Sequence, residues 1–173
     1  LDTTAAQFRR PEGEDARHDY LWRAFRDAPP RGSVGVFNRS YYEQVVGERL
    51  HPDAVTDASV PARLKRAAED GSLWDERLRQ IADAERYWHE NGVEVVKLFL
   101  HVSPEEQRRR LVERTERPEK RWDFSRADVT ERARWDDYMD AYAAAFDATH
   151  TDASPWYVVP ADDKWAARAA VAA

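Results

Sequence analysis

The chain has 173 residues, of which 42% are hydrophobic and 35% are charged, and its formal net charge is −6 at pH 7. This length is typical of one domain with its own core, and the negative balance argues against a general binder of nucleic acids or anionic membranes. The absence of cysteine excludes disulfides, thiolate zinc sites and a cysteine nucleophile. Without a signal-peptide pattern or an apolar run near the ~20 residues that span a bilayer, we expect a soluble, cytoplasmic protein.

The first half of the chain alternates predicted strands with predicted helices. In order, we predict a strand near 4–8, a helix over 11–30, a strand over 33–37, a helix over about 40–49, a loop over 51–60, a helical turn over 61–68 and a helix over 72–92. The last of these is the most regular, because its apolar residues recur on one helical face and Asn91-Gly92 follows as a stop signal.

The second half continues the alternation. Residues 93–102 form a mostly apolar run, which is typical of a parallel strand covered on both faces. Ser103 is a predicted N-cap for a helix over 103–115, with Glu106 completing a capping box. We then predict a long helix over 125–150, with Ser125 and Asp128 as its capping pair.

The chain closes with a strand and a turn over 155–163, followed by a helix that Asp162 or Asp163 caps. Strands that alternate with helices through short connections predict an α/β fold with parallel strands and right-handed crossovers. In such sheets ligands bind beyond the carboxyl ends of the strands, which here are followed by 38–40, 101–103 and 160–163.

Asn38, Arg39 and Ser40 follow the buried strand directly and allow two interpretations. In one, Asn38 or Ser40 caps the next helix and Arg39 forms a surface ion pair. In the other, this is a phosphate and magnesium site, where Asn38 holds a metal-bound water and Arg39 grips a phosphate with two hydrogen bonds.

A basic segment connects two of the predicted helices. Its cations are Arg108, Arg109, Arg110, Arg114, Arg117, Lys120, Arg121 and Arg126. Interleaved acids favour a solvated, ion-paired face for most of them. Their position on the ligand side of the sheet favours a lid that brings cations onto a polyanion and excludes water.

Two further groups have simple structural interpretations. Asp136, Asp137 and Asp140 have the spacing of an aspartate-rich magnesium motif, but that motif belongs to all-helical enzymes, so we expect these aspartates to face solvent. Lys164 beside Asp162 is interpreted as part of a helix cap, with a nucleotide-contacting loop as the alternative.

Several of these stretches, taken in order, resemble the polyphosphate kinase 2 family. They are "HDYLWR", "GVFNRSYYEQVVGERLH", "RYWHENGVEVVKLFLHVSPEEQRRRL", "RPEKRWDFS" and "SPWYVVPADDKW", and they run along almost the whole chain. The resemblance implies a three-layer α/β/α P-loop kinase-like fold, with a mostly parallel sheet and a helical lid at about 108–135. It also implies magnesium-dependent phosphoryl transfer between inorganic polyphosphate and a nucleotide, in a protein that often forms dimers or tetramers.

The resemblance also assigns site residues. Asn38 to Ser40 match the Walker B-like segment of the family, where asparagine is a known variant of aspartate. The implied catalytic residues are Arg39, Arg114 and Lys120, the implied phosphate- or nucleotide-binding residues are Glu43, Arg117, Arg121, Arg132 and Lys164, and Asn38 would hold Mg²⁺ through water.

The sequence departs from the family in two respects. Asp123 stands where a basic residue is usual, and the sequence contains no G-x-x-x-x-G-K loop, whose backbone amides and lysine cradle phosphate. We therefore expect a single domain, 1–173, that is incomplete at its N-terminus or degenerate, with little or no activity from these residues alone. An ATP-dependent nucleotide kinase of the thymidylate-kinase type and a non-catalytic polyphosphate- or nucleotide-binding module remain alternatives.

Overall fold

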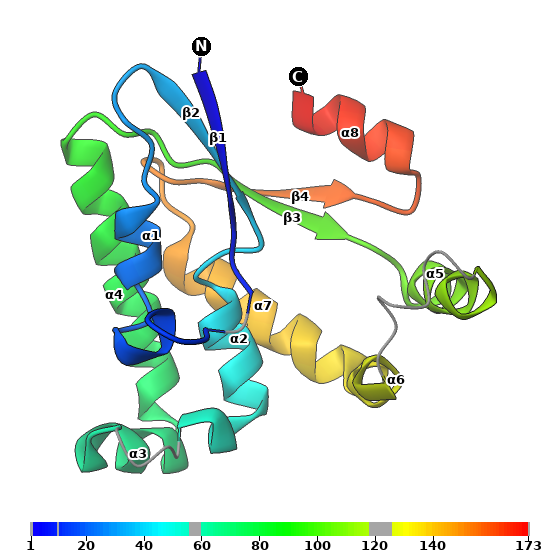
Figure 1. Cartoon of the computed structure of the whole chain (residues 1–173), viewed down its shortest axis with the longest axis horizontal. Helices are drawn as coiled ribbons and strands as arrows, with labels where there is room; N and C mark the ends of the chain where they lie inside the picture. The colour runs from blue at the N-terminus through cyan, green and yellow to red at the C-terminus, as the bar shows by residue number, and fades with distance from the viewer. Residues whose placement is uncertain (1, 10, 56–59, 118–125, 173) are drawn as a thin grey trace.

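The computed structural model describes residues 2–9, 11–55, 60–117 and 126–172. In this part of the chain the strands are β1 Asp2–Gln7, β2 Ser33–Asn38, β3 Lys97–His101 and β4 Trp156–Pro160 (Figure 1). They form two separate parallel pairs, β1 with β2 and β3 with β4. Parallel partners require crossover connections, and the segments between the strands supply them as helices. The predicted α/β class with parallel strands is therefore confirmed.

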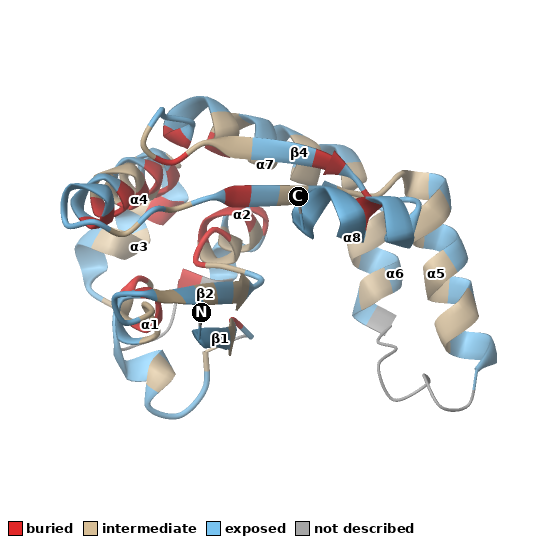
Figure 2. Ribbon diagram, turned by 90° about the horizontal axis from the view of Figure 1, so that it is seen from above, coloured by how far each residue is buried: buried red, intermediate tan, exposed pale blue. Residues whose placement is uncertain are grey.

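The helices leave one face of these strands partly open, because Val34 and Val36 in β2 and Leu98 and Leu100 in β3 are exposed. The expectation that the strand within 93–102 is covered on both faces is therefore wrong for the described residues. The helices are α1 Trp22–Arg26, α2 Glu43–Leu50, α3 Ala62–Glu69, α4 Ser72–Glu90, α5 Pro104–Glu116, α6 Arg126–Arg132, α7 Trp135–Thr149 and α8 Lys164–Ala172, with 3-10 turns at Asp15–Arg17 and Pro52–Val55. In Figures 1 and 2, α7 and α8 lie on opposite sides of the β3–β4 pair, which gives helix, sheet and helix layers. None of the described helices is long and apolar enough to cross a membrane.

The main core lies where α2, α4 and α7 meet the strands. Its buried members include Phe8, Tyr41, Tyr42, Val45, Val46, Leu78, Ile81, Ala84, Trp88, Ala141 and Ala145. The periodicity that predicted α4 is confirmed, since its expected apolar face is buried throughout. Burying a large aliphatic or aromatic side chain of this kind stabilises a fold by roughly 1.5–3 kcal/mol. The packing of α2, α4 and α7 therefore forms a stable base beneath the strands.

Gly35 in β2 is required by packing rather than by its backbone angles. A Cβ atom at this position would lie 2.9 Å from Pro29 Cδ and 3.2 Å from Pro29 Cβ. Any larger residue would push the proline turn that precedes β2 away from the strand. The glycine therefore fixes the approach of residues 29–32 to β2, and with it the position of the strand that carries Asn38.

Two helix predictions differ from the structure in their continuity. The helix expected over 11–30 consists of the turn Asp15–Arg17 and the short α1, because His18 is extended (φ −106°, ψ 169°). The helix expected over 125–150 is two helices, since it breaks at residues 133–134 between α6 and α7. Ser125, the expected cap, lies outside the described residues.

Two smaller differences concern α3 and α5. The helical turn expected over 61–68 is the full helix α3. At the start of α5, Ser103 Oγ accepts from the N–H of Glu106 at 3.2 Å, as expected of an N-cap. The reciprocal half of the capping box is wrong, because the Glu106 carboxylate binds Arg109 and Arg110 instead.

Candidate functional site

The end of β2 presents Asn38 and Arg39 to solvent. The carbonyl of Asn38 accepts from the N–H of Phe8 at 3.1 Å, which ties this strand end to the residue after β1. Arg39 has φ +58°, and among the described residues it is the single non-glycine residue with a positive φ. Ser40 Oγ accepts from the N–H of Tyr42 at 3.3 Å and makes the turn into α2. Neither Asn38 nor Ser40 caps α2, since its N-cap position is Tyr42 without a side-chain cap hydrogen bond, so the capping interpretation is wrong. The side chains of Asn38 and Arg39 are exposed.

Arg39 forms an ion pair with Glu43, one turn along, with 3.4 Å between Nη1 and Oε2. The exposed fractions of the two side chains are 59% and 42%, so water screens this pair. Partial burial raises the pKa of Glu43, and the charge of Arg39 opposes that shift. Burial raises the pKa of Tyr142 on α7 to about 12, and the charges of Glu43 and Arg39 act on the same hydroxyl. Tyr142 therefore belongs to the neighbourhood of this strand end.

A cavity of about 440 Å³ lies beside Tyr142, between β3, α5, α6 and α7. Two predicted site residues, Arg114 and Arg132, line it together with the aromatic side chains of Phe99, Trp135, Tyr138 and Tyr142. Arg132 also has a structural task, because its Nη1 donates to the Pro104 carbonyl at 2.5 Å and to Gln107 Oε1 at 3.1 Å. The cavity combines flat apolar walls with guanidinium groups, which suits a ligand that carries both a ring and negative charge.

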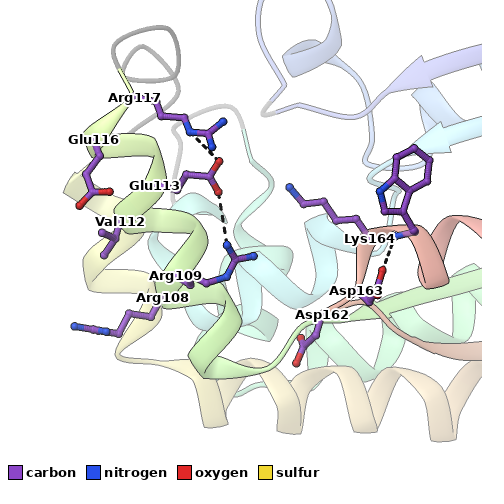
Figure 3. A pocket seen from close by; sticks show the side chains of 10 residues that line it. Arg108, Arg109, Val112, Glu113, Glu116, Arg117, Asp162, Asp163 and Lys164 are labelled. Atoms are coloured by element: carbon purple, nitrogen blue, oxygen red, sulfur yellow. Dashed lines mark hydrogen bonds and ion pairs between the residues drawn. The ribbon is translucent and has the colours of Figure 1, made fainter.

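A second cavity, of about 860 Å³, separates α5 from the start of α8 (Figure 3). It brings together Arg117 and Lys164, which the resemblance assigned to phosphate or nucleotide binding. Glu113 forms ion pairs with Arg117, at 3.2 Å from Nε, and with Arg109, at 4.0 Å from Nη1. The charged lining residues balance: Arg108, Arg109, Arg117 and Lys164 against Glu113, Glu116, Asp162 and Asp163. The solvated, ion-paired interpretation therefore fits the outer face of α5 better than a bare cationic surface does.

The two aspartates after β4 have different roles, which the sequence did not separate. Asp163 Oδ1 accepts from the N–H groups of Trp165 and Ala166 at 2.8 and 3.1 Å and so caps α8. Asp162 Oδ1 accepts from the N–H of Ser103 at 2.7 Å, and Arg110 Nη2 donates to the Asp162 carbonyl at 3.0 Å. Asp162 and Arg110 thus join the carboxyl ends of β3 and β4, and only the three-dimensional pairing of these strands reveals this.

The remaining predicted residues were expected to form the lid or to hold a metal ion. Lys120 and Arg121 lie outside the described residues, as does Asp123. The described residues contain no group of three or more histidines and carboxylates that could hold a metal ion. Asp137 pairs with Arg134 at 3.3 Å, as expected of a solvent-facing aspartate. Magnesium keeps several waters and uses substrate phosphates as ligands, so the exposed Asn38 amide fits it only as a partner of metal-bound water.

A family model described as polyphosphate kinase 2 matches residues 2–173. The chain belongs to the polyphosphate kinase 2 family. It is 49% identical over 161 residues to an ADP-polyphosphate phosphotransferase of Rhodopseudomonas palustris, covering 93% of this chain and 55% of that relative. It is 39% identical over 160 residues to an AMP/ADP-polyphosphate phosphotransferase of Meiothermus ruber, covering 92% of this chain and 54% of that relative.

A solved member of the polyphosphate kinase 2 family has the same fold. The crystal structure of polyphosphate kinase 2 from Arthrobacter aurescens superposes with a TM-score of 0.83 at 43% identity, over 98% of this chain and 54% of that one. The P-loop kinase-like α/β fold is therefore confirmed. The chain spans about half the length of the curated polyphosphate kinase 2 relatives that it matches.

Proposed function

We propose that this polyphosphate kinase 2 domain transfers phosphoryl groups between inorganic polyphosphate and a nucleoside mono- or diphosphate. The observation that carries the proposal is the cavity that Arg114 and Arg132 line together with four aromatic side chains. Arg39, at the end of β2, adds an exposed cation whose ion pair with Glu43 is open to water. The names of the matched relatives, which act on ADP or on AMP and ADP, give the substrate class.

Phosphoryl transfer requires positioning and charge stabilisation more than covalent help from the protein. An oxygen of the nucleotide's terminal phosphate attacks, and the polyphosphate chain leaves. Arg39 stabilises the negative charge on the transferring group, with Arg114 and Lys120 approaching from the lid. Because the Arg39–Glu43 pair is exposed, exchanging the carboxylate for a phosphate costs little free energy.

Five other residues are assigned to phosphate or nucleotide binding; the four cations among them bind the anionic substrates, and Glu43 acts through its ion pair with Arg39. These five residues are Glu43, Arg117, Arg121, Arg132 and Lys164. Arg132 serves through position, since it holds α6 against the start of α5 at the rim of the 440 Å³ cavity. A cavity of this size accommodates a nucleoside, and its aromatic walls offer stacking surfaces for the base. Arg117, at the end of α5, and Lys164, at the start of α8, both line the larger cavity. A polyphosphate chain bound there would compete with Glu113 for Arg117.

Magnesium completes the proposed site. Asn38 would hold it through a bound water, and the phosphate oxygens of the substrates would supply the remaining ligands; when bound, the ion would neutralise charge on those oxygens. We further propose that residues 108–135 act as the lid, since α5 and α6 stand away from the strands at one end of the molecule (Figure 1). A homo-oligomer, dimer or tetramer, remains part of this proposal.

The decisive experiment assays the complete gene product with polyphosphate, Mg²⁺ and either AMP or ADP. Arg39→Ala should lower kcat/KM by about 100-fold or more, because a charge on the transferring phosphoryl group is lost. Arg79→Ala is the matched control: Arg79 forms an exposed ion pair with Asp83, also four residues apart, at 2.9 Å on α4. It should leave turnover unchanged.

The outcomes separate the alternatives. Unchanged turnover in Arg39→Ala would remove Arg39 from the mechanism. Turnover with ATP but not with polyphosphate as donor would overturn the proposal in favour of a nucleotide kinase. Binding of polyphosphate in calorimetry without any turnover would indicate a binding module.

A further inference from the structure

A carboxylate in the core lies directly beneath the proposed site. Glu85 on α4 is 0% exposed. Its Oε1 accepts from both hydroxyls of the tyrosine pair that follows the β2 strand end, at 2.7 Å from Tyr41 and 2.9 Å from Tyr42. Both rings are buried as well, at 4% and 2% exposure. One buried oxygen therefore holds the first two residues beyond Ser40.

The other oxygen of Glu85 is held just as completely. Oε2 accepts from Lys97 Nζ at 2.5 Å and from Ser154 Oγ at 2.8 Å. Lys97 Nζ also donates to the carbonyl of Thr149 at 2.7 Å. These partners stand at the start of β3, before β4 and at the end of α7. We call this set of residues (Tyr41, Tyr42, Glu85, Lys97, Thr149 and Ser154) the buried node.

Stability alone does not explain the buried node. Removing two charges from water is so unfavourable that well-packed apolar residues often serve a fold as well as a buried ion pair does. A buried ion pair fixes the arrangement of its neighbours, because every buried donor must meet an acceptor. The neighbours here are the two tyrosines that lead out of the strand end.

The segment between β2 and these tyrosines is short and conformationally strained. Asn38 is fixed by its parallel pairing with Gln7 and by the Phe8 N–H. Tyr41 is fixed by Glu85. Only Arg39 and Ser40 connect the two anchors, and Arg39 has the left-handed φ of +58° that a residue with a Cβ rarely adopts. Such strain persists only where the surroundings hold it in place.

We propose that Glu85, with Lys97 as its counter-ion, is a positioning residue that holds Arg39 in its strained conformation through the hydroxyls of Tyr41 and Tyr42. The inference rests on the proposed role of Arg39 in phosphoryl transfer. Without the two hydroxyl contacts, the peptide after Asn38 relaxes toward negative φ, and the Arg39 side chain leaves the strand end in another direction.

The first test is a double-mutant cycle in the complete gene product. The variant Tyr41→Phe/Tyr42→Phe keeps both buried rings and removes the two donors to Glu85, together with one acceptor of Lys97 Nζ at 3.3 Å. It should lower kcat/KM by about 10-fold or more, because misplacing a charged group reduces turnover steeply. In the Arg39→Ala background the same change should have an effect of less than about 2-fold, since both changes then act through one side chain.

Tyr20→Phe is the matched control. Tyr20 also donates its hydroxyl to α4, to the Arg77 carbonyl at 3.1 Å and to Gln80 Oε1 at 2.9 Å, and neither acceptor belongs to the buried node. It should leave kcat/KM unchanged at a temperature where all variants are folded. An equal loss from the tyrosine pair in the wild-type and Arg39→Ala backgrounds, or no loss at all, would overturn the positioning role.

A second test does not depend on activity. Glycine adopts a left-handed φ without strain, so Arg39→Gly should raise Tm by about 2 °C. In the Tyr41→Phe/Tyr42→Phe background this rise should vanish, because the strain has already been released. The same rise in both backgrounds would overturn the inference. If Arg39→Ala leaves turnover intact, the proposed function fails, and the Tm cycle still decides whether the buried node holds Arg39.

Discussion

Two glutamates of this fold accept hydrogen bonds from cationic side chains that differ in their exposure to water. Glu85, in the core, receives four donors: two tyrosines, a lysine and a serine. Glu106, on α5, receives Arg109 at 2.6 Å through both Nε and Nη2, and Arg110 Nε at 2.7 Å. The Glu85 and Lys97 side chains are 0% and 5% exposed, whereas those of Glu106 and Arg109 are 12% and 64% exposed.

This difference separates fixed from exchangeable charge. Around Glu85 no water can replace a lost partner, so the elements that meet there are bound to one geometry. At Arg109 water substitutes readily, and this exposed arginine of α5 can turn from a carboxylate to another anion at little cost. The molecule thus has a fixed floor under the end of β2 and an arm, α5 and α6, on which the exposed cations Arg109 and Arg117 can exchange their anionic partners.

The strongest test of the fixed floor is Lys97→Met. Methionine fills a similar volume but leaves the charge of Glu85 buried without a counter-ion, so the free energy of unfolding should fall by about 3–5 kcal/mol. Urea unfolding followed by circular dichroism measures this. Adding Glu85→Gln should recover part of the loss, because the amide still accepts from the tyrosines and removes the unpaired charge.

Arg79→Met is the control for the same charge-to-methionine change on an exposed pair. Arg79 and Asp83 are 64% and 44% exposed, so this variant should alter the free energy of unfolding by less than about 0.5 kcal/mol. Should Lys97→Met destabilise the protein by no more than Arg79→Met does, the core pair would have no special role and the contrast between floor and arm would be lost.

Ser154→Ala examines a single hydroxyl of the buried node. Ser154 Oγ donates to Glu85 Oε2 at 2.8 Å, and its loss leaves a buried carboxylate oxygen with one donor fewer. The free energy of unfolding should fall by about 1–3 kcal/mol.

In Ser72→Ala, the hydroxyl that is lost donates to an exposed carboxylate, Asp70 Oδ1, at 2.6 Å. That variant should change stability by less than about 0.5 kcal/mol in the same unfolding experiment. Equal effects of the two substitutions would contradict the distinction.

The sequence predicted best where the signal is local. The periodicity of α4, the apolar run of β3 and the serine that caps α5 all depend on residues within a few positions of each other, and all three elements form. The capping box failed because Glu106 has two arginines within three and four residues, and a charge-assisted hydrogen bond competes well with a backbone N–H. The sequence alone does not show which of these two partners the Glu106 carboxylate binds.

The buried node was missed because its members come from distant parts of the chain. Its one local signal is that Glu85 follows Ile81 by four residues and precedes Trp88 by three, which places a carboxylate on the apolar face of α4. Lys97 likewise interrupts an apolar run in β3. A charge at a core position predicts a partner, but only the packing of α4 against β3 and α2 shows which one. The strain at Arg39 is equally invisible before the backbone is known.

The smallest expected effect concerns the arm and its response to pH. Hydrogen bonds from Arg109 and Arg110 lower the pKa of Glu106 to about 2, from the ordinary value of 4.5. A carboxyl whose pKa is depressed in the folded state contributes stability above pH 4.5, and this contribution is lost as the pH falls toward 2. The carboxyl carbon of Glu106 should therefore keep its ionised NMR shift at pH 3.5. In Arg109→Gln, which removes the first of the two arginines, its midpoint should move up toward 4.5. Because the arm is solvated, the helical signal of α5 should survive that substitution. A wild-type midpoint near 4.5 would show that water already competes fully for these arginines, and the exchange with phosphate proposed for the arm would then be easier still.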